Sequence, residues 1–149
     1  MKIEDEIHQK VFKNEWQKAT LNLIFTASWL GNKHKEFFKP FGITQQQYNV
    51  LRILRGSHPK SISTSVIKTR MLDKNSDASR IVDRLTAKDL VLKKTCPSDR
   101  RLVDVTISGK GLRLLEVMDT KIDALDNGLG SLTEKEAKVL NQLLDKLRS

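Results

Sequence analysis

Features of secreted and membrane proteins are scarce in this sequence of 149 residues. Its one cysteine, Cys96, cannot form an internal disulfide. No apolar run approaches the roughly 20 residues that span a bilayer. The start, MKIEDEIHQK, is too polar for a signal peptide. We therefore expect a cytoplasmic protein without a disulfide or a membrane span.

Catalytic and metal-binding patterns are scarce as well. The three histidines, His8, His34 and His58, are scattered, and there are no paired cysteines, no nucleophile elbow and no phosphate-binding glycine loop. We therefore expect a protein that is not an enzyme and that holds neither a metal nor a cofactor.

Positive charge, in contrast, is abundant and unevenly distributed. Of a formal net charge of +9, residues 1–39 contribute +2, residues 40–108 contribute +7 and residues 109–149 contribute zero. A local basic excess suits a polyanion such as nucleic acid or an anionic membrane, although a merely solvated surface gives the same pattern. Charge alone leaves these alternatives open.

Apolar spacing in the first third predicts two helices. A stripe of apolar residues over residues 12–37 marks a long helix that ends before Pro40. Thr44 and Gln47 form a capping box at the start of the next helix. Gly56 suits the left-handed position that follows a helix end.

Two shorter helices and a hairpin are expected next. One helix spans residues 61–72 with Ser61 or Ser63 as its cap, and another runs from a cap at Asn75 or Ser76 to about residue 89. We expect their buried residues to be Val66, Ile67, Met71, Ala78, Ile81, Val82 and Leu85. The period then changes to two, which predicts antiparallel strands over residues 90–95 and 102–107 around a turn at 96–99.

The last part of the chain returns to helical spacing. Ser108 caps a long helix that is expected to reach about residue 129, and Thr133 with Glu136 forms a capping box for a final helix. The apolar side of that final helix consists of Leu140, Leu143, Leu144 and Leu147.

This order predicts a mainly α fold with a small β-hairpin (α+β), a winged helix-turn-helix. We expect one unit over residues 1–149, with a DNA-binding lobe at 41–108 and dimerisation helices at 1–40 and 109–149. The apolar stripes of the terminal helices would stay uncovered in a monomer, whereas a two-fold dimer would bury them.

Residues 99–111, DRRLVDVTISGKG, resemble the D-x-R-x-x-x-V-x-L-T-x-x-G signature of the MarR (multiple antibiotic resistance regulator) family. Asp99, Arg101, Val105 and Gly111 match it, whereas Ile107 and Ser108 replace leucine and threonine conservatively. The segment SDASRIVDRLTAKDLV resembles the recognition helix of that family, and ITQQQYNVLRIL resembles the preceding helix. The resemblance extends along essentially the whole chain.

The resemblance implies a homodimer that places a recognition helix in the major groove and a wing at the minor groove of double-stranded DNA, as a transcriptional regulator and repressor. Arg80 is the best candidate for base readout, and Asp99 would stabilise the wing by holding Arg101. The candidate DNA-binding residues are Ser61, Ser63, Thr64, Asn75, Ser76, Asp77, Ser79, Arg80, Lys93, Lys94, Arg100 and Arg101.

The resemblance also implies a small-molecule effector of unknown identity. The pocket residues that we expect are Trp29, His34, Phe37, Phe38 and Tyr48, although they would also serve as plain core and surface residues. Two alternatives stay open: a basic architectural protein that binds DNA without sequence preference, and a redox-responsive regulator in which Lys93 and Lys94 lower the pKa of Cys96. We expect no membrane partner.

Overall fold

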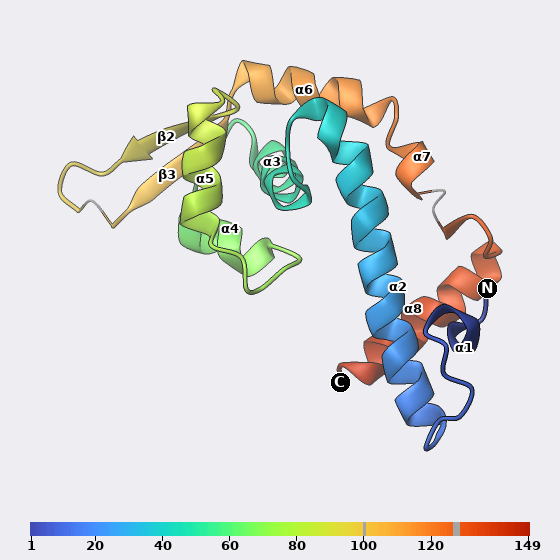
Figure 1. The fold of residues 1–149 in the computed structure, drawn as a ribbon. Coiled ribbons are helices and arrows are strands. Elements are labelled where there is room, and N and C mark those ends of the chain that lie inside the picture. The colour runs from blue at the N-terminus through green and yellow to red at the C-terminus, as the bar shows by residue number, and fades with distance from the viewer. Residues whose placement is uncertain (100, 127–128) are drawn as a thin grey trace.

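The computed structural model consists of a winged-helix lobe and an arm, which is formed by the terminal helices within residues 3–38 and 134–147 (Figure 1). It describes residues 1–99, 101–126 and 129–149. The elements, in chain order, are α1 (Ile3–Glu6), α2 (Glu15–Phe38), η1 (Lys39–Phe41), α3 (Gln45–Ser57), β1 (Ile62–Ser63), α4 (Thr64–Arg70), α5 (Ala78–Ala87), β2 (Val91–Thr95), β3 (Val103–Ile107), α6 (Gly109–Asp119), α7 (Asp123–Asp126) and α8 (Glu134–Leu147). The predicted class, helices with a small β-hairpin, is confirmed.

The lobe packs α3, α4, α5 and α6 around one hydrophobic core that also includes a small antiparallel sheet (Figure 1). The alternation expected for residues 102–107 holds, because Val105 and Ile107 are buried while Asp104 is exposed. The fully buried side chains are Phe38, Val50, Leu51, Leu54, Ile67, Met71, Val82, Leu85, Val91, Val105, Leu115 and Met118. This core holds α4 and α5 in the lobe through their buried residues Ile67, Val82 and Leu85.

The sheet has the strand order β1-β3-β2, so it contains one more strand than we predicted. β2 and β3 form the expected hairpin, with Val91 opposite Ile107 and Thr95 opposite Val103. The additional strand, β1, places Ile62 opposite Val105 on the other edge of β3. It shortens the predicted helix 61–72, which begins instead at Thr64 with Ser63 as its cap.

Side-chain caps begin four helices, α3, α4, α6 and α8, where the sequence predicts them. Both capping boxes are present, the first with Thr44 and Gln47 and the second with Thr133 and Glu136. The Ser108 hydroxyl caps α6 by accepting a hydrogen bond from the backbone amide of Gly111. Each of these caps satisfies a backbone donor that a helix start leaves open.

Four local predictions are wrong. The cap of α5 is Asp77, whose carboxylate accepts a hydrogen bond from the Arg80 amide at 3.1 Å, rather than Asn75 or Ser76. Gly56 lies inside α3 and has no positive φ. Val66 faces solvent. The helix that begins after Ser108 ends at residue 119, and α7 follows as a separate turn.

Both termini lie at the end of the molecule away from the wing (Figure 1), and Glu4 of α1 pairs there with Lys18 of α2. The leucine stripe of α8 is left largely uncovered by the rest of the chain: Leu143 is 60% and Leu147 66% exposed. Within the described residues, no helix is both long and apolar enough to cross a membrane.

Candidate DNA-binding surface

The helix-turn-helix consists of α4, a turn over residues 71–77 and α5. Ile67 on α4 and Val82 and Leu85 on α5 are buried in the lobe, which leaves the opposite faces of both helices in solvent. Residues that face away from the core at the start of α5 are therefore available to a partner.

The start of α5 presents short polar side chains and an arginine. Asn75, Ser79 and Arg80 are exposed, and Asp77 is exposed while it caps the helix. Ser76 differs, because it is buried and its hydroxyl has no hydrogen-bond partner among the described residues. The exposed residues share a region from which base edges in a major groove can be reached.

Arg84 extends this region and was missed by the sequence analysis. It lies four residues after Arg80, one helical turn along α5, and is exposed. The helical spacing from Arg80 could have identified it.

The start of α4 holds a small hydroxyl cluster. The Ser63 hydroxyl accepts a hydrogen bond from the Val66 amide and lies 2.9 Å from the Ser65 hydroxyl. Ser61 is exposed and Thr64 is half-buried. Ser63 therefore acts as a cap in the free protein, and Ser61 and Ser65 are the more accessible hydroxyls.

The hairpin projects from the lobe as a wing (Figure 1). Its tip is closed by hydrogen bonds from the Cys96 amide to the Leu102 carbonyl, 2.9 Å, and from the Leu102 amide to the Asp99 carbonyl, 3.0 Å. Lys94 and Arg101 are exposed on it, whereas Arg100 lies outside the described residues. The wing therefore carries cations at its tip and along β2.

Asp99 contacts Arg101 in a way that differs from the expectation. Its carboxylate accepts a hydrogen bond from the Arg101 backbone amide at 2.9 Å, and no ion pair with the Arg101 guanidinium occurs among the described residues. The turn is set as expected, but the Arg101 side chain is left available for another partner.

A salt bridge braces the wing against α5. The Lys93 ammonium lies 2.7 Å from the Asp83 carboxylate on α5. Lys93 was predicted to contact DNA, and in the free protein it is paired. This bridge links two elements of the candidate surface, although a pair this exposed adds at most about 1 kcal/mol to stability.

Cys96 sits at the base of the wing tip, half-buried. The Ser98 hydroxyl lies 3.1 Å from its sulfur. Hydrogen bonds from that hydroxyl and from the backbone of Ser98 and Asp99 hold the pKa of the Cys96 thiol below its usual value. The direction agrees with the expectation, but its cause is Ser98 rather than Lys93 and Lys94.

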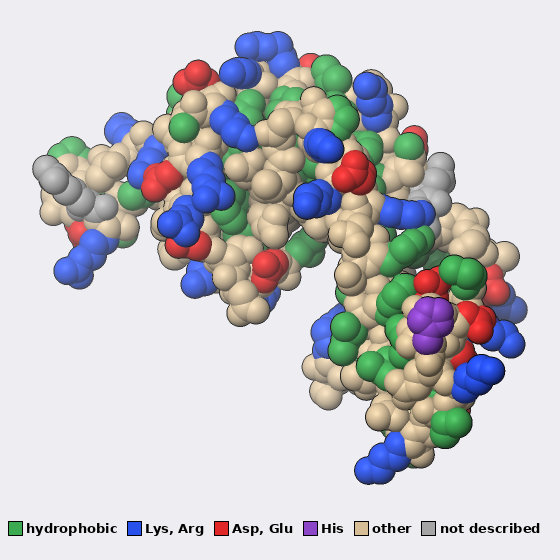
Figure 2. Space-filling model, in the orientation of Figure 1, with side chains coloured by type: hydrophobic (Ala, Val, Ile, Leu, Met, Phe, Trp, Pro, Cys, Tyr) green, Lys and Arg blue, Asp and Glu red, His purple; other side chains and the backbone are tan. Residues whose placement is uncertain are grey.

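Basic side chains spread over the visible face of the lobe, whereas hydrophobic side chains gather on the arm near the termini (Figure 2). The lobe thus presents the charge that a polyanion requires, and the arm presents apolar surface.

The predicted effector residues lie in two hollows on α2. A groove of about 330 Å³, here called the α2–α3 groove, is lined by His34, Phe38, Gln45, Tyr48, Asn49, Arg52, Leu72, Ile122 and Leu125. A wider hollow of about 530 Å³ is lined by Trp29, Asn32, Lys33, Glu36, Phe37, Ala124 and Leu125. The five predicted residues therefore divide between two sites.

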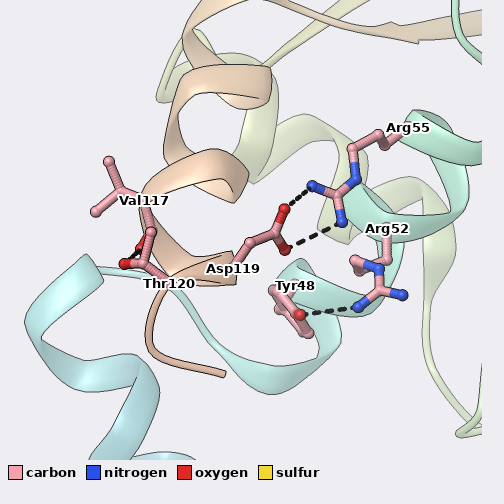
Figure 3. Close-up of polar contacts among 6 residues, drawn as sticks. All are labelled: Tyr48, Arg52, Arg55, Val117, Asp119 and Thr120. Carbon is pink, nitrogen blue, oxygen red and sulfur yellow. Dashed lines mark hydrogen bonds and ion pairs between the residues drawn. The ribbon is translucent and has the colours of Figure 1, made fainter. Parts of the chain in front are cut away.

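Two arginines of α3 make polar contacts with Tyr48 and Asp119 (Figure 3), and one of them, Arg52, also lines the α2–α3 groove. Arg52 donates a hydrogen bond to the Tyr48 hydroxyl at 3.1 Å and has no carboxylate partner among the described residues. Arg55 binds the Asp119 carboxylate through both guanidinium ends, at 2.6 and 3.2 Å. That pairing lowers the pKa of Asp119 and joins the lobe to the end of α6.

Known proteins with a similar sequence and fold identify the family of this chain. The sequence model of the MarR family matches residues 43–103, from the start of the lobe to β3. A crystal structure of a MarR transcription factor from Planctomyces limnophilus is 33% identical, with a TM-score of 0.71, and the match covers 91% of this chain and 98% of that one. This chain belongs to the MarR family.

Two further relatives agree with this assignment. The HTH-type transcriptional regulator MhqR of Bacillus subtilis (strain 168) is 26% identical over 119 residues, 78% of this chain and 77% of the relative. A mutant MarR from E. coli, solved in complex with operator DNA, has a TM-score of 0.77 at 24% identity, over 93% of this chain and 99% of that one. As a MarR-family member, the chain is a DNA-binding transcriptional regulator.

Proposed function

We propose that the chain acts as a homodimeric repressor on a pseudopalindromic operator. The observation that carries this proposal is the exposed first turn of α5, in which Ser79 and Arg80 stand clear of the core, together with a projecting wing whose tip bears Arg101 (Figure 1). The E. coli relative with this fold was solved on operator DNA. Repression follows where the operator overlaps a promoter, because a bound dimer excludes the polymerase.

The two parts of this surface would read DNA differently. Arg80 can donate two hydrogen bonds to a guanine edge in the major groove, whereas Arg101 suits the negative potential of a narrow minor groove. The hydroxyls of Ser61 and Ser65 can bond phosphates, which sets position rather than sequence.

The dimer is supported by apolar surface on the arm. Trp16 is 80% exposed on α2, and Leu143 and Leu147 are similarly uncovered on α8. Side chains of this kind gather beside the termini (Figure 2). A second copy of the arm would bury them, and two lobes related by a two-fold axis would match half-sites about one turn of DNA apart.

A small-molecule effector is part of the proposal. The α2–α3 groove offers the rings of Phe38 and Tyr48, whose centroids lie 4.8 Å apart, and the cation of Arg52, and the described residues of its lining include no carboxylate. Such a groove favours a flat, apolar anion. An occupant would touch both α2 of the arm and α3 of the lobe, which would change the spacing of the two recognition helices.

Selection of genomic DNA tests the proposal. The purified protein is mixed with fragmented genomic DNA at near-physiological salt, and the bound fragments are sequenced. Enrichment of one short inverted repeat in promoters supports a specific regulator. Recovery of fragments without a shared sequence supports the architectural alternative, because binding through phosphates alone has no sequence preference.

Cys96 defines the remaining alternative, a redox-responsive regulator. Its lowered pKa and its place in the turn at the wing tip are the observations that favour it. Mass spectrometry after mild peroxide treatment, paired with a DNA titration, separates the outcomes: a modified Cys96 with unaltered DNA affinity excludes regulation through this thiol.

A further inference from the structure

The turn over residues 71–77, here the α4–α5 turn, determines where the recognition helix begins. Its own hydrogen bonds are local: the Asp73 carboxylate accepts from the Asn75 amide at 2.9 Å, and the Lys74 ammonium donates to the Thr69 carbonyl at 2.6 Å. Bonds between residues this close in sequence shape the turn but do not fix its position on the lobe.

Asn49 supplies the connection to the lobe. Its side-chain oxygen accepts a hydrogen bond from the Leu72 backbone amide at 2.9 Å, across 23 positions of sequence. In the described part of the chain, the other hydrogen bonds of this turn join residues at most five positions apart. The Leu72 side chain is 81% exposed and cannot anchor the turn by burial.

The helix that carries Asn49 is firmly held. Val50, Leu51 and Leu54 of α3 are almost completely buried. The turn is attached to the lobe at two points. The side chain of Met71 is buried in the core, and the backbone amide of the next residue, Leu72, is bound by Asn49. These two attachment points, Met71 and Leu72, are consecutive residues at the start of the turn, and Asp77 at its end caps α5.

We propose that Asn49 is a positioning residue for sequence-specific DNA binding. It holds the α4–α5 turn so that the exposed start of α5 meets the bases in register. This inference rests on the proposed operator binding. Asn49 and Leu72 also line the α2–α3 groove, so an occupant that takes the Asn49 amide would release the turn.

Three variants of the full chain test the proposal. Asn49→Leu removes the acceptor at similar volume, Asn49→Asp keeps an oxygen in place, and Gln45→Glu adds the same charge to the same groove without touching the turn. Each is titrated with the selected operator and with random-sequence DNA. Hydrogen exchange is measured on the peptide that contains Leu72.

Asn49→Leu should weaken operator binding about fivefold to tenfold, the range that one hydrogen bond supplies. Its binding to random-sequence DNA should not change, because no charge near phosphate is removed. Exchange at Leu72 should become faster. Asn49→Asp and Gln45→Glu should both resemble the parent protein.

The proposal is overturned if Asn49→Leu binds the operator as tightly as the parent does, or if Asn49→Asp is as weak as Asn49→Leu. Equal losses on operator and random-sequence DNA would also overturn it, because they indicate general misfolding. If the parent protein selects no operator, the proposed function fails. If hydrogen exchange at Leu72 is unchanged in Asn49→Leu, the role of Asn49 in holding the turn is refuted independently of DNA binding.

Discussion

Gly111 lies where the wing returns to the core, and replacing it with alanine should be costly. A Cβ added at Gly111 would lie 2.3 Å from the Leu90 carbonyl oxygen and 2.7 Å from a side-chain carbon of Ile107. The first distance is about 1 Å inside ordinary carbon–oxygen contact. The oxygen belongs to the backbone and already accepts a hydrogen bond from the Ser108 amide, so it cannot turn aside.

The expected loss follows from this overlap. Overpacking typically costs 1–3 kcal/mol, and a clash with backbone belongs at the upper end, so Gly111→Ala should lower the free energy of unfolding by about 3 kcal/mol. For a chain of this size each kcal/mol moves Tm by about 3 °C, which gives a fall of about 9 °C. Thermal and urea unfolding at matched protein concentration measure it.

Gly56→Ala is the matched control. Gly56 is helical and its added Cβ would meet only the end of Arg70, at 3.8 Å. Alanine should therefore stabilise the protein by about 0.5–1 kcal/mol, through its better helix propensity. Equal effects of the two substitutions, or a neutral Gly111→Ala, would refute the packing argument.

Three further predictions concern DNA binding, pH and assembly. Arg101→Ala should weaken operator binding and change stability by less than about 0.5 kcal/mol, because the side chain is exposed. A DNA titration checks it, with Lys135→Ala, which removes an exposed cation of α8 outside the candidate surface, as the control. Unaltered affinity of Arg101→Ala would contradict the prediction. Asp119→Asn should cost about 0.5 kcal/mol at neutral pH, as expected of a partly exposed ion pair. Arg55 lowers the pKa of Asp119, so the stabilisation is present above the usual carboxyl pKa and is lost as pH falls through the pKa of the folded state. The stabilities of variant and parent from urea unfolding should therefore converge in acid. A difference that stays constant with pH would contradict the salt bridge. Leu143→Glu should give monomers in sedimentation experiments at concentrations where Leu92→Glu, on the exposed wing, stays dimeric; dimers in both would exclude α8 from the interface.

Local chemistry accounts for what the sequence could predict. A capping box needs only two residues three positions apart, so the starts of α3 and α8 were predictable from Thr44 and Thr133. The alternation of Val103, Val105 and Ile107 likewise revealed both the strand and its buried face.

The missed features depend on residues distant in sequence. β1 has two residues and pairs with β3 through Ile62 and Val105, which lie too far apart for any local pattern. Asn75, Ser76 and Asp77 are all good helix caps, and only the fold shows that α5 begins at Ala78, which makes Asp77 the cap.

Some residues of the candidate site were also predictable from local sequence, whereas others depend on contacts between distant residues. The exposed polar face of α5 could be predicted from its helical spacing, because the apolar positions identify the buried side. Asn49 could not, because its role depends on a backbone amide 23 positions away. The sequence placed the five effector candidates in one pocket, and only the fold shows that Trp29 and His34 line different hollows.

The most direct test of sequence-specific operator binding is a specificity ratio. The protein is titrated at about 150 mM salt against the selected inverted repeat and against the same bases in shuffled order. Sequence-specific regulation requires at least about a thousandfold tighter binding to the inverted repeat. Equal affinities for the two DNAs would contradict it and leave the basic lobe as a general grip on DNA.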